Sequence, residues 1–235
     1  MGSSRDFAET RELLGGAKAA MIVADEPVAI RLKYKGTGTV TSVTVTAATG
    51  VVNITSDGGT DSYTFAAYTT MGALEDAINS DGVFEARVLD ALRSDNPDDV
   101  LVAGAKTITT DGYYDLVVDT SVQKALTYRC TYDRNVKSKA PAENHRVKLN
   151  EFMYYATLGG ASVNDVQVWE CDIAKNIETQ VYQALSVSAT VTTVRFAAGK
   201  GSIASGFGND LVVRLIDPTS LADSGAYLQV NYTRE

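Results

Sequence analysis

The segment from residue 38 to residue 89 constrains the fold most, because the order of its residues describes a complete small module. Three runs rich in threonine and valine are separated by turn residues, and a short amphipathic segment and a further apolar run follow them. Runs of this composition, bounded by Gly, Asp and Ser, are typical of β-strands. The sequence therefore predicts a β-β-β-α-β module, and we interpret it as a surface and not as a catalytic centre.

The elements around and within this module can be placed from local signals. Residues 28–35 alternate apolar with polar side chains, which is the period of a half-buried strand. Thr69 or Thr70 can cap a helix with apolar residues on one face, and Gly82 ends it. These elements, with the strands that follow, predict a β-rich α+β domain over residues 27–120. The apolar helix residues are Met71, Leu74 and Ile78, and the following strands are expected at 84–89, 106–110 and 114–118, the last two joined through Asp111 and Gly112.

The second half of the chain, residues 121–235, consists of short apolar runs divided by turn clusters. Strands at this spacing favour an antiparallel β-sandwich or a jelly-roll-like barrel. We therefore expect a mainly β protein, in which the small β-rich α+β domain is followed by the antiparallel sandwich. The predicted runs are 125–132, 146–149, 152–158, 163–173, 180–196, 211–216 and 226–232.

Residues 1–26 are predicted to form an N-terminal arm with one short helix. Phe7, Leu13 and Leu14 stand at near-helical spacing among charged residues, and two glycines follow where a helix would end. An isolated helix this short is marginally stable in water, so it has to pack on its own body or on another subunit. We interpret the three apolar residues as a contact to a neighbouring subunit.

Charge is spread unevenly over a chain whose net charge is −8. Residues 57–119 hold thirteen acidic and three basic residues, whereas residues 120–150 hold seven basic and two acidic ones. The basic segment is either a solvated loop or a docking loop for an acidic neighbour, for which complementary charge sets register and on-rate. The acidic remainder argues against nucleic-acid binding. The basic residues that we select as contact candidates are Arg134, Lys137, Lys139, Arg146 and Lys148.

The sequence contains no complete motif for catalysis, for a cofactor or for a metal. A single histidine, His145, and two cysteines, Cys130 and Cys171, cannot supply the usual zinc sets. Residues 199–202 lack the spacing of a phosphate-binding loop, and the acidic turn at 94–100 fits no calcium loop. We predict a protein without enzymatic activity, cofactor or metal, although a catalytic carboxylate pair stays open. Two buried free thiols are expected, with a disulfide as the alternative.

The chain also lacks targeting signals of two kinds. No window reaches the ~18 to 20 apolar residues that a membrane-spanning helix needs, and the first residues lack the basic-then-apolar order of a secretory signal. We therefore expect a soluble protein without a membrane partner that is made in the cytoplasm.

Two parts of the sequence resemble virion proteins of tailed bacteriophages. The first module, with its segments SYTFAAY, MGALEDAIN and DGVFEARVL, resembles a small domain repeated across such proteins. The second half, which ends in GNDLVVRLIDPTSLADSGAYLQVNYTRE, looks like the β-sandwiches of capsid-decorating or cement proteins and of some tail proteins. The resemblance implies a homo-oligomer, often a trimer, that is made in the host cytoplasm, sits on the capsid exterior and ties neighbouring subunits of the major capsid protein, or other virion proteins, together.

Other functions remain open beside decoration. A tail, connector or head-fibre component would share the same resemblance. A carbohydrate-binding adhesin module could use the tyrosines and Trp169, although aromatic residues at alternate strand positions more often pack in a core.

Overall fold

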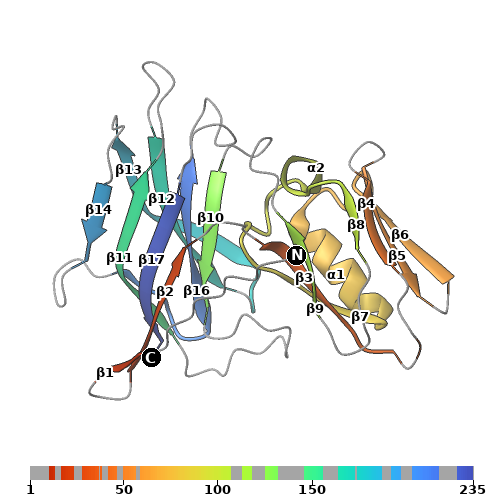
Figure 1. Ribbon diagram of the computed structural model, residues 1–235, viewed down its shortest axis with the longest axis horizontal. Helices are drawn as coiled ribbons and strands as arrows, with labels where there is room; N and C mark the ends of the chain where they lie inside the picture. Colours follow the sequence, from red (N-terminus) through yellow and green to blue (C-terminus); the bar gives the residue numbers. More distant parts are fainter. Residues whose placement is uncertain are drawn as a thin grey trace. The chain divides into compact units, whose positions relative to one another are not determined.

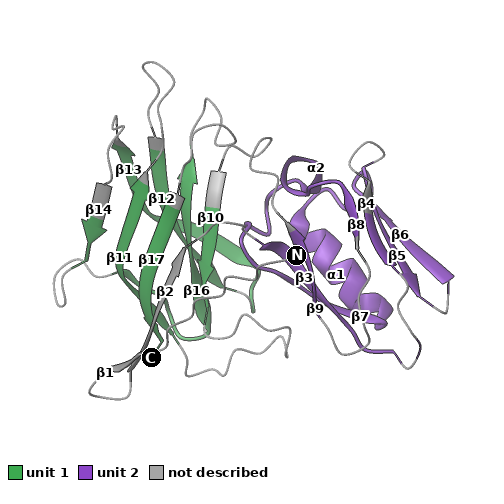
Figure 2. Cartoon of the chain, in the orientation of Figure 1, with its two compact units in different colours: residues 1–25, 124–132, 139–235 green, residues 26–123, 133–138 purple. Residues whose placement is uncertain are grey.

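The structure is a computed structural model in which the chain forms two compact units (Figure 2). Unit 1 comprises residues 1–25, 124–132 and 139–235, and unit 2 comprises residues 26–123 and 133–138. The predicted three-part division of the chain stays a prediction. The structure describes residues 11–13, 17–23, 28–36, 38, 42–46, 50–56, 59–106, 113–117, 125–131, 146–155, 164–172, 174–186, 192–196, 203–216 and 227–234.

The described part of unit 2 contains two antiparallel sheets and two helices (Figure 1). One sheet has the strand order β7-β3-β9 and the other the order β6-β5-β4-β8. The elements are β3 (Val28–Tyr34), β4 (Ser42–Thr46), β5 (Val51–Ser56), β6 (Gly59–Thr64), α1 (Met71–Asp81), β7 (Phe84–Val88), α2 (Pro97–Val100), β8 (Gly104–Lys106) and β9 (Tyr113–Val117).

The predicted helix after Thr70 is confirmed as α1. The Thr70 side chain accepts a hydrogen bond from the Ala73 backbone N–H, and Gly82 ends the helix with a φ of 76°. This left-handed conformation costs glycine little, because it has no Cβ. The apolar face is fully buried against the three-stranded sheet, and its residues are Met71, Leu74 and Ile78.

Unit 1 is an antiparallel β-sandwich, as predicted. Its first sheet has the order β1-β2-β17-β11-β14, with β15 also paired to β11, and its second sheet has the order β10-β16-β12-β13. Inward residues of both sheets form one apolar core that includes Phe152, Val168, Val213 and Val230. The strands are β1 (Arg11–Leu13), β2 (Ala17–Val23), β10 (Ala125–Cys130), β11 (Val147–Tyr155), β12 (Asn164–Asp172), β13 (Ile177–Ser186), β14 (Thr192–Arg195), β15 (Ile203–Ala204), β16 (Asn209–Ile216) and β17 (Tyr227–Arg234).

The predicted N-terminal helix is wrong wherever this region is described. Strands β1 and β2 form a hairpin across residues 11–23, and β2 pairs along β17 from Val23 opposite Gln229 to Lys18 opposite Arg234. A short helix is marginal by itself, whereas a strand beside β17 satisfies backbone groups that would otherwise form an open sheet edge. Tertiary pairing therefore overrides the local helical spacing.

Three other predicted strand features differ in detail. The runs 146–149 and 152–158 belong to the single strand β11, whose register with β17 shifts between Leu149 and Glu151. The run 180–196 divides into β13 and β14, which lie in different sheets. Strands β8 and β9 do not pair with each other, because β8 joins β4 and β9 joins β3.

Candidate docking surface

The structure places only part of the predicted contact set. Leu13 is the last residue of β1, Arg146 directly precedes β11, and Lys148 is the second residue of β11. The remaining candidates, Phe7, Leu14, Arg134, Lys137 and Lys139, lie outside the described residues.

Arg146 lies beside an aromatic side chain that the sequence did not single out. Its guanidinium carbon is 5.6 Å from the centroid of the Phe207 ring, which is a cation–π distance. Two positions further on, Lys148 lies between two buried residues of β11 and pairs across the sheet with Thr233 and Ala204. The end of the basic segment therefore adjoins an exposed aromatic ring, because Phe207 is 66% exposed.

Phe207 stands in a tight turn that joins β15 to β16. The Asn209 N–H donates to the Gly206 carbonyl at 3.2 Å, and Gly208 has a φ of 80°. A positive φ at the third of four turn residues is typical of a type II turn, in which the second residue, here Phe207, projects outward. We call residues 205–209 the Phe207 turn.

Side chains from distant strands hold the Phe207 turn in place. One carboxylate oxygen of Glu170 on β12 accepts from the Gly206 N–H at 2.6 Å and from the Asn209 amide at 2.8 Å. Ser205 exchanges two hydrogen bonds with the Val147 backbone, at 2.8 and 3.0 Å. These hydrogen bonds fix the backbone that carries the exposed Phe207 ring. Aromatic residues and arginine are enriched in protein interfaces, where a few of them contribute most of the binding energy.

Phe207 is not among the contact residues predicted from the sequence. The available signal was an aromatic residue between two glycines, directly before a strand. Its exposure could not be read from that signal, since the bracing Glu170 is 36 residues away from Gly206.

A buried ion pair lies in the second sheet of unit 1, on the opposite side from the sandwich core. Arg129 and Asp210 have side chains only 2% and 4% exposed, with 3.7 Å between a guanidinium nitrogen and a carboxylate oxygen. The strand register places Asp210 directly opposite Cys171. Thr127 and Thr131, at alternate positions with Arg129 along the chain, are buried as well.

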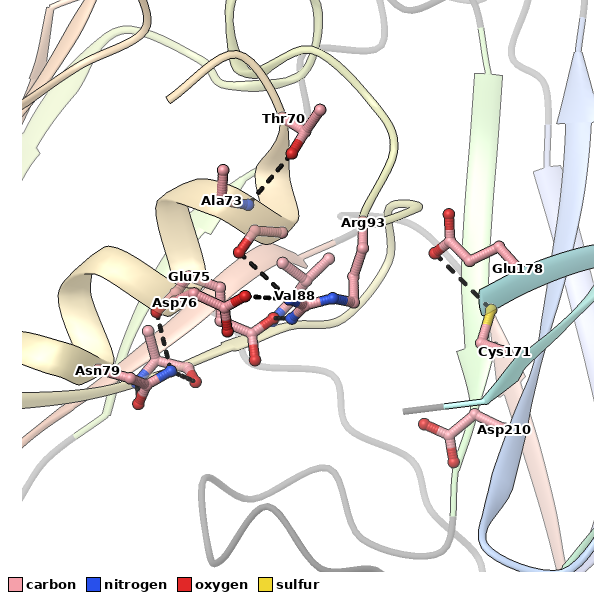
Figure 3. A network of polar contacts seen from close by, with 12 residues as sticks. Thr70, Ala73, Glu75, Asp76, Asn79, Val88, Arg93, Cys171, Glu178 and Asp210 are labelled. Carbon is pink, nitrogen blue, oxygen red and sulfur yellow. Dashed lines mark hydrogen bonds and ion pairs between the residues drawn. The ribbon is translucent and has the colours of Figure 1, made fainter. Parts of the chain in front are cut away.

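Both cysteines are free and buried, as expected. The Cys171 thiol lies 3.9 Å from a carboxylate oxygen of Glu178, and Figure 3 shows it together with Asp210. Burial raises the pKa of the Cys171 thiol to about 11, and Arg129 opposes this increase only in part. A thiol with such a pKa is protonated at neutral pH and is a poor nucleophile.

One group of charged residues in unit 2 is bonded within the unit. The Glu75 carboxylate on α1 accepts from the Val88 N–H at 3.2 Å and from the Arg93 guanidinium (Figure 3). Arg93 also binds Asp76 at 2.8 Å and the Gly72 carbonyl at 3.2 Å. This network ties the helix to β7 and to the segment after it, so we interpret it as structural.

Many of the described aromatic residues considered for glycan binding lie inside the two units. The Trp169 indole N–H donates to the Gln167 side chain at 2.8 Å, and Trp169 is half-buried. Six tyrosines of the described part of the chain are buried, which agrees with the interpretation of alternate aromatic positions as packing. They are Tyr34, Tyr63, Tyr114, Tyr128, Tyr154 and Tyr232.

The chain is thus a mainly β protein with an antiparallel sandwich unit. Comparisons with known proteins do not define its class more narrowly. No protein-family model matches the chain, and no curated protein is similar to it. A solved structure of the infectious bursal disease virus Gx strain is 10% identical, with a TM-score of 0.22, over 92% of this chain and 56% of the viral one. The VP2 subviral particle of that virus is 9% identical, with a TM-score of 0.20, over 90% of this chain and 57% of its own. The chain thus spans little more than half the length of either, and superpositions with TM-scores this low do not establish a common fold.

Neither helix of the described part of the chain has the length and apolar character needed to cross a membrane.

Proposed function

We propose that this chain is a non-enzymatic virion structural protein of a tailed bacteriophage. In this role it binds the outside of the capsid and stabilises contacts between shell subunits as a decoration or cement protein. The proposal rests on the resemblance of residues 38–89 and of the C-terminal sandwich to such proteins. One structural observation supports it, namely the pair of Arg146 and Phe207 on the braced Phe207 turn.

Stabilising a shell needs apolar contact area and complementary charge, and it needs no reacting group. Phe207 offers an apolar anchor that is 66% exposed, and Arg146 offers positive charge next to it, with Lys148 two positions further along the chain. A chain whose net charge is −8 would then approach an acidic patch of the shell through its locally basic side. Many such contacts, each weak, add up over a shell by multivalency.

A homo-oligomer fits this role, because several linked copies can engage several shell subunits at once. The resemblance favours a trimer. A tail, connector or head-fibre position is the second virion assignment that the same resemblance allows, and copy number distinguishes it from decoration.

The direct test mixes the purified protein with capsids of its source particle. Bound copies per shell subunit are then counted by quantitative mass spectrometry and located by electron microscopy. Decoration predicts saturation at hundreds of copies over the whole icosahedral surface by the multivalent contacts assumed above. A dozen copies or fewer at one vertex would indicate a connector or tail position, and no binding would contradict the proposal.

Two variants connect this test to the docking surface. Phe207→Ala and Arg146→Ala are expected to weaken capsid binding at least tenfold, because anchoring residues at interfaces contribute about 2 kcal/mol or more. Lys175→Gln is the matched control, since Lys175 is a 73% exposed cation of the same unit that pairs with Asp172 in a separate turn. Equal binding by all three variants would remove the Phe207 turn from the capsid contact.

A further inference from the structure

Strands β12 and β13, which lie side by side in unit 1, present a polar face that contains the one tryptophan of the chain (Figure 1). Val166 and Val168 of β12 belong to the sandwich core, so the alternate positions Asp165, Gln167 and Trp169 lie on the opposite face of the sheet. Side-chain hydrogen bonds among these three residues confirm that they share this outer face. The outer face therefore combines an indole ring with planar polar groups.

This outer face is buried at β10 and open at β13. The row of residues that crosses the sheet at Trp169 consists of Arg129, Val212, Trp169 and Gln180. Arg129 and Val212 are buried, Trp169 is half-buried, and Gln180 is exposed. A ligand would therefore approach Trp169 from the β13 side.

A bulge of β13 lies directly beside the tryptophan. The register between the two strands shifts between Val168 and Trp169, which leaves Val181 without a partner on β12. Gln180 and Val181 are both exposed, so two consecutive side chains of β13 are accessible at the level of the indole. Bulges are over-represented at sheet edges and next to active sites, where they redirect a side chain.

Hydrogen bonds fix the orientation of the polar side chains around Trp169. The indole N–H donates to the Gln167 side-chain carbonyl at 2.8 Å, and the Gln167 amide donates to Asp165 at 2.6 Å. The Gln183 amide of β13 donates to both oxygens of the same carboxylate, each at 3.0 Å. Four side chains of two strands thus form one hydrogen-bonded network, and side chains held in this way give the pre-organised geometry that a binding site needs.

The network leaves particular groups for a ligand. Among the residues that the structure describes, the side-chain carbonyl of Gln183 and the side-chain amide of Gln180 have no hydrogen-bond partner in the protein, and both residues are exposed. A side-chain amide can accept and donate, which suits neighbouring hydroxyl groups. Because the indole N–H is already bonded, Trp169 offers a ligand its ring surface, which packs against apolar groups.

The charges of this face favour a neutral ligand. Asp165 is already bonded by two glutamine amides, and Arg214, opposite Gln167 on β16, carries the opposite charge. An anion would be repelled by Asp165 and a cation by Arg214. The groups open to a ligand, on Gln180 and Gln183, are uncharged.

We propose that unit 1 binds a neutral saccharide on this face. A sugar ring carries apolar C–H groups on its faces and hydroxyl groups at its edge. The ring face packs on Trp169, while hydroxyl groups exchange hydrogen bonds with Gln180 and Gln183, and these few polar groups fix the orientation of the sugar. Asp165 and Gln167 are positioning residues, because they hold Gln183 and Trp169. The inference does not depend on the capsid assignment, since it concerns the isolated protein.

The first test uses the fluorescence of Trp169, which reports directly on the proposed site because the chain has one tryptophan. The full chain is titrated with neutral trisaccharides of glucose, mannose, galactose and N-acetylglucosamine, and with a sialylated trisaccharide. At least one neutral sugar is expected to change the emission in a saturable way, and added salt should not weaken its binding, because no charge pair forms. No response to the neutral sugars, a response to the sialylated sugar alone, or strong weakening by salt would overturn the proposal.

Two glutamine variants connect this response to the site. Gln183→Ala should raise the half-saturating sugar concentration about fivefold, the loss expected for one hydrogen bond. Gln229→Ala is the matched control and should bind like the wild type, because Gln229 lies on β17 in the other sheet. Both variants keep Trp169 as the reporter, and circular dichroism checks that they fold. Equal affinity of the three proteins, or an equal loss in both variants, would remove the sugar from this face.

Discussion

Both units contain ion pairs between their own residues, but they differ in the large apolar side chains that they expose. In unit 2, Arg93 is bound by Glu75 and Asp76, and Arg31 forms a two-point pair with Asp115 at 2.7 and 2.8 Å. Among the residues that the structure describes, the exposed large apolar residues of unit 2 are Val102 at 40% and Tyr113 at 36%. The described part of unit 1 instead exposes four such residues, at 41% to 69%. These are Ile177, Val181, Leu185 and Phe207.

The difference indicates which unit makes contacts. Even the exposed Tyr113 of unit 2 is flanked by the cations of Arg31 and Lys33, at 5.4 and 5.5 Å from its ring centroid. The exposed apolar residues of unit 1 lie on β13, which pairs on one side only among the described strands, and on the Phe207 turn, and a partner can bury them there. We therefore expect unit 1 to carry the contact surfaces, and this expectation is the central claim tested below.

The largest stability effect is expected from the buried ion pair of unit 1. Asp210→Ala would leave Arg129 without its buried carboxylate and should lower the free energy of unfolding by about 3 to 5 kcal/mol. Urea unfolding followed by the fluorescence of Trp169, which lies in the same sheet, measures the change. Lys175→Ala removes the 73% exposed cation of the pair with Asp172 and should leave the midpoint nearly unchanged. A similar loss in both variants would contradict the burial of the Arg129 pair.

A truncated core residue in unit 2 tests whether the core of unit 2 is stabilised independently of the core of unit 1. Leu74→Ala removes a fully buried side chain of α1 and should cost about 2 to 5 kcal/mol. Amide hydrogen exchange should accelerate in α1 and β7, while the exchange of β12 and β16 stays as in the wild type. Ser80→Ala, at an exposed position of the same helix, is the control. Faster exchange in β12 would show that the two cores are coupled.

Alkaline pH should affect unit 1 before unit 2. The Cys171 thiol has a folded pKa of about 11 against an ordinary value of 9.0, because burial favours its protonated form. The stabilisation from this shift is fully present below pH 9 and is lost as the pH rises from 9.0 towards about 11. In unit 2, burial raises the pKa of Tyr114 from 10.0 to about 12, so the stabilisation from this shift begins to be lost at a higher pH than that from Cys171.

Comparing Cys171→Ala with the wild type isolates the contribution of the thiol. The variant should lose less free energy of unfolding than the wild type between pH 9 and pH 11, as measured by urea unfolding at each pH. Parallel curves for the two proteins would show that Cys171 does not titrate in this range.

The smallest stability effect is expected at the docking surface. Phe207→Ala should change the free energy of unfolding by less than about 0.5 kcal/mol, because the ring is mostly exposed. Thermal unfolding checks this value, and Gly208→Ala provides the contrast, since it imposes a left-handed φ of 80° on a residue with a Cβ. A large loss in Phe207→Ala would mean that the ring packs within unit 1 and does not serve a partner.

Local signals predicted some elements well and others not at all. Helix α1 was predictable because its cap, apolar face and terminal glycine lie within 13 consecutive positions, from Thr70 to Gly82. The hairpin of β1 and β2 was not, since its conformation depends on pairing with β17 at the far end of the chain. The basic residues Arg146 and Lys148 were predicted as contacts. Phe207, which lies beside Arg146, was not predicted, because the position of its turn depends on a hydrogen bond to Glu170 of the distant strand β12.

The central claim is tested most directly by comparing the amide hydrogen exchange of the free protein in dilute solution with that of the protein in its source particles. We expect assembly to slow exchange in residues 177–186 and 203–209 of unit 1 and to leave exchange in strands β4, β5 and β6 of unit 2 unchanged. Protection confined to unit 2, with residues 177–186 and 203–209 exchanging as in the free protein, would contradict it.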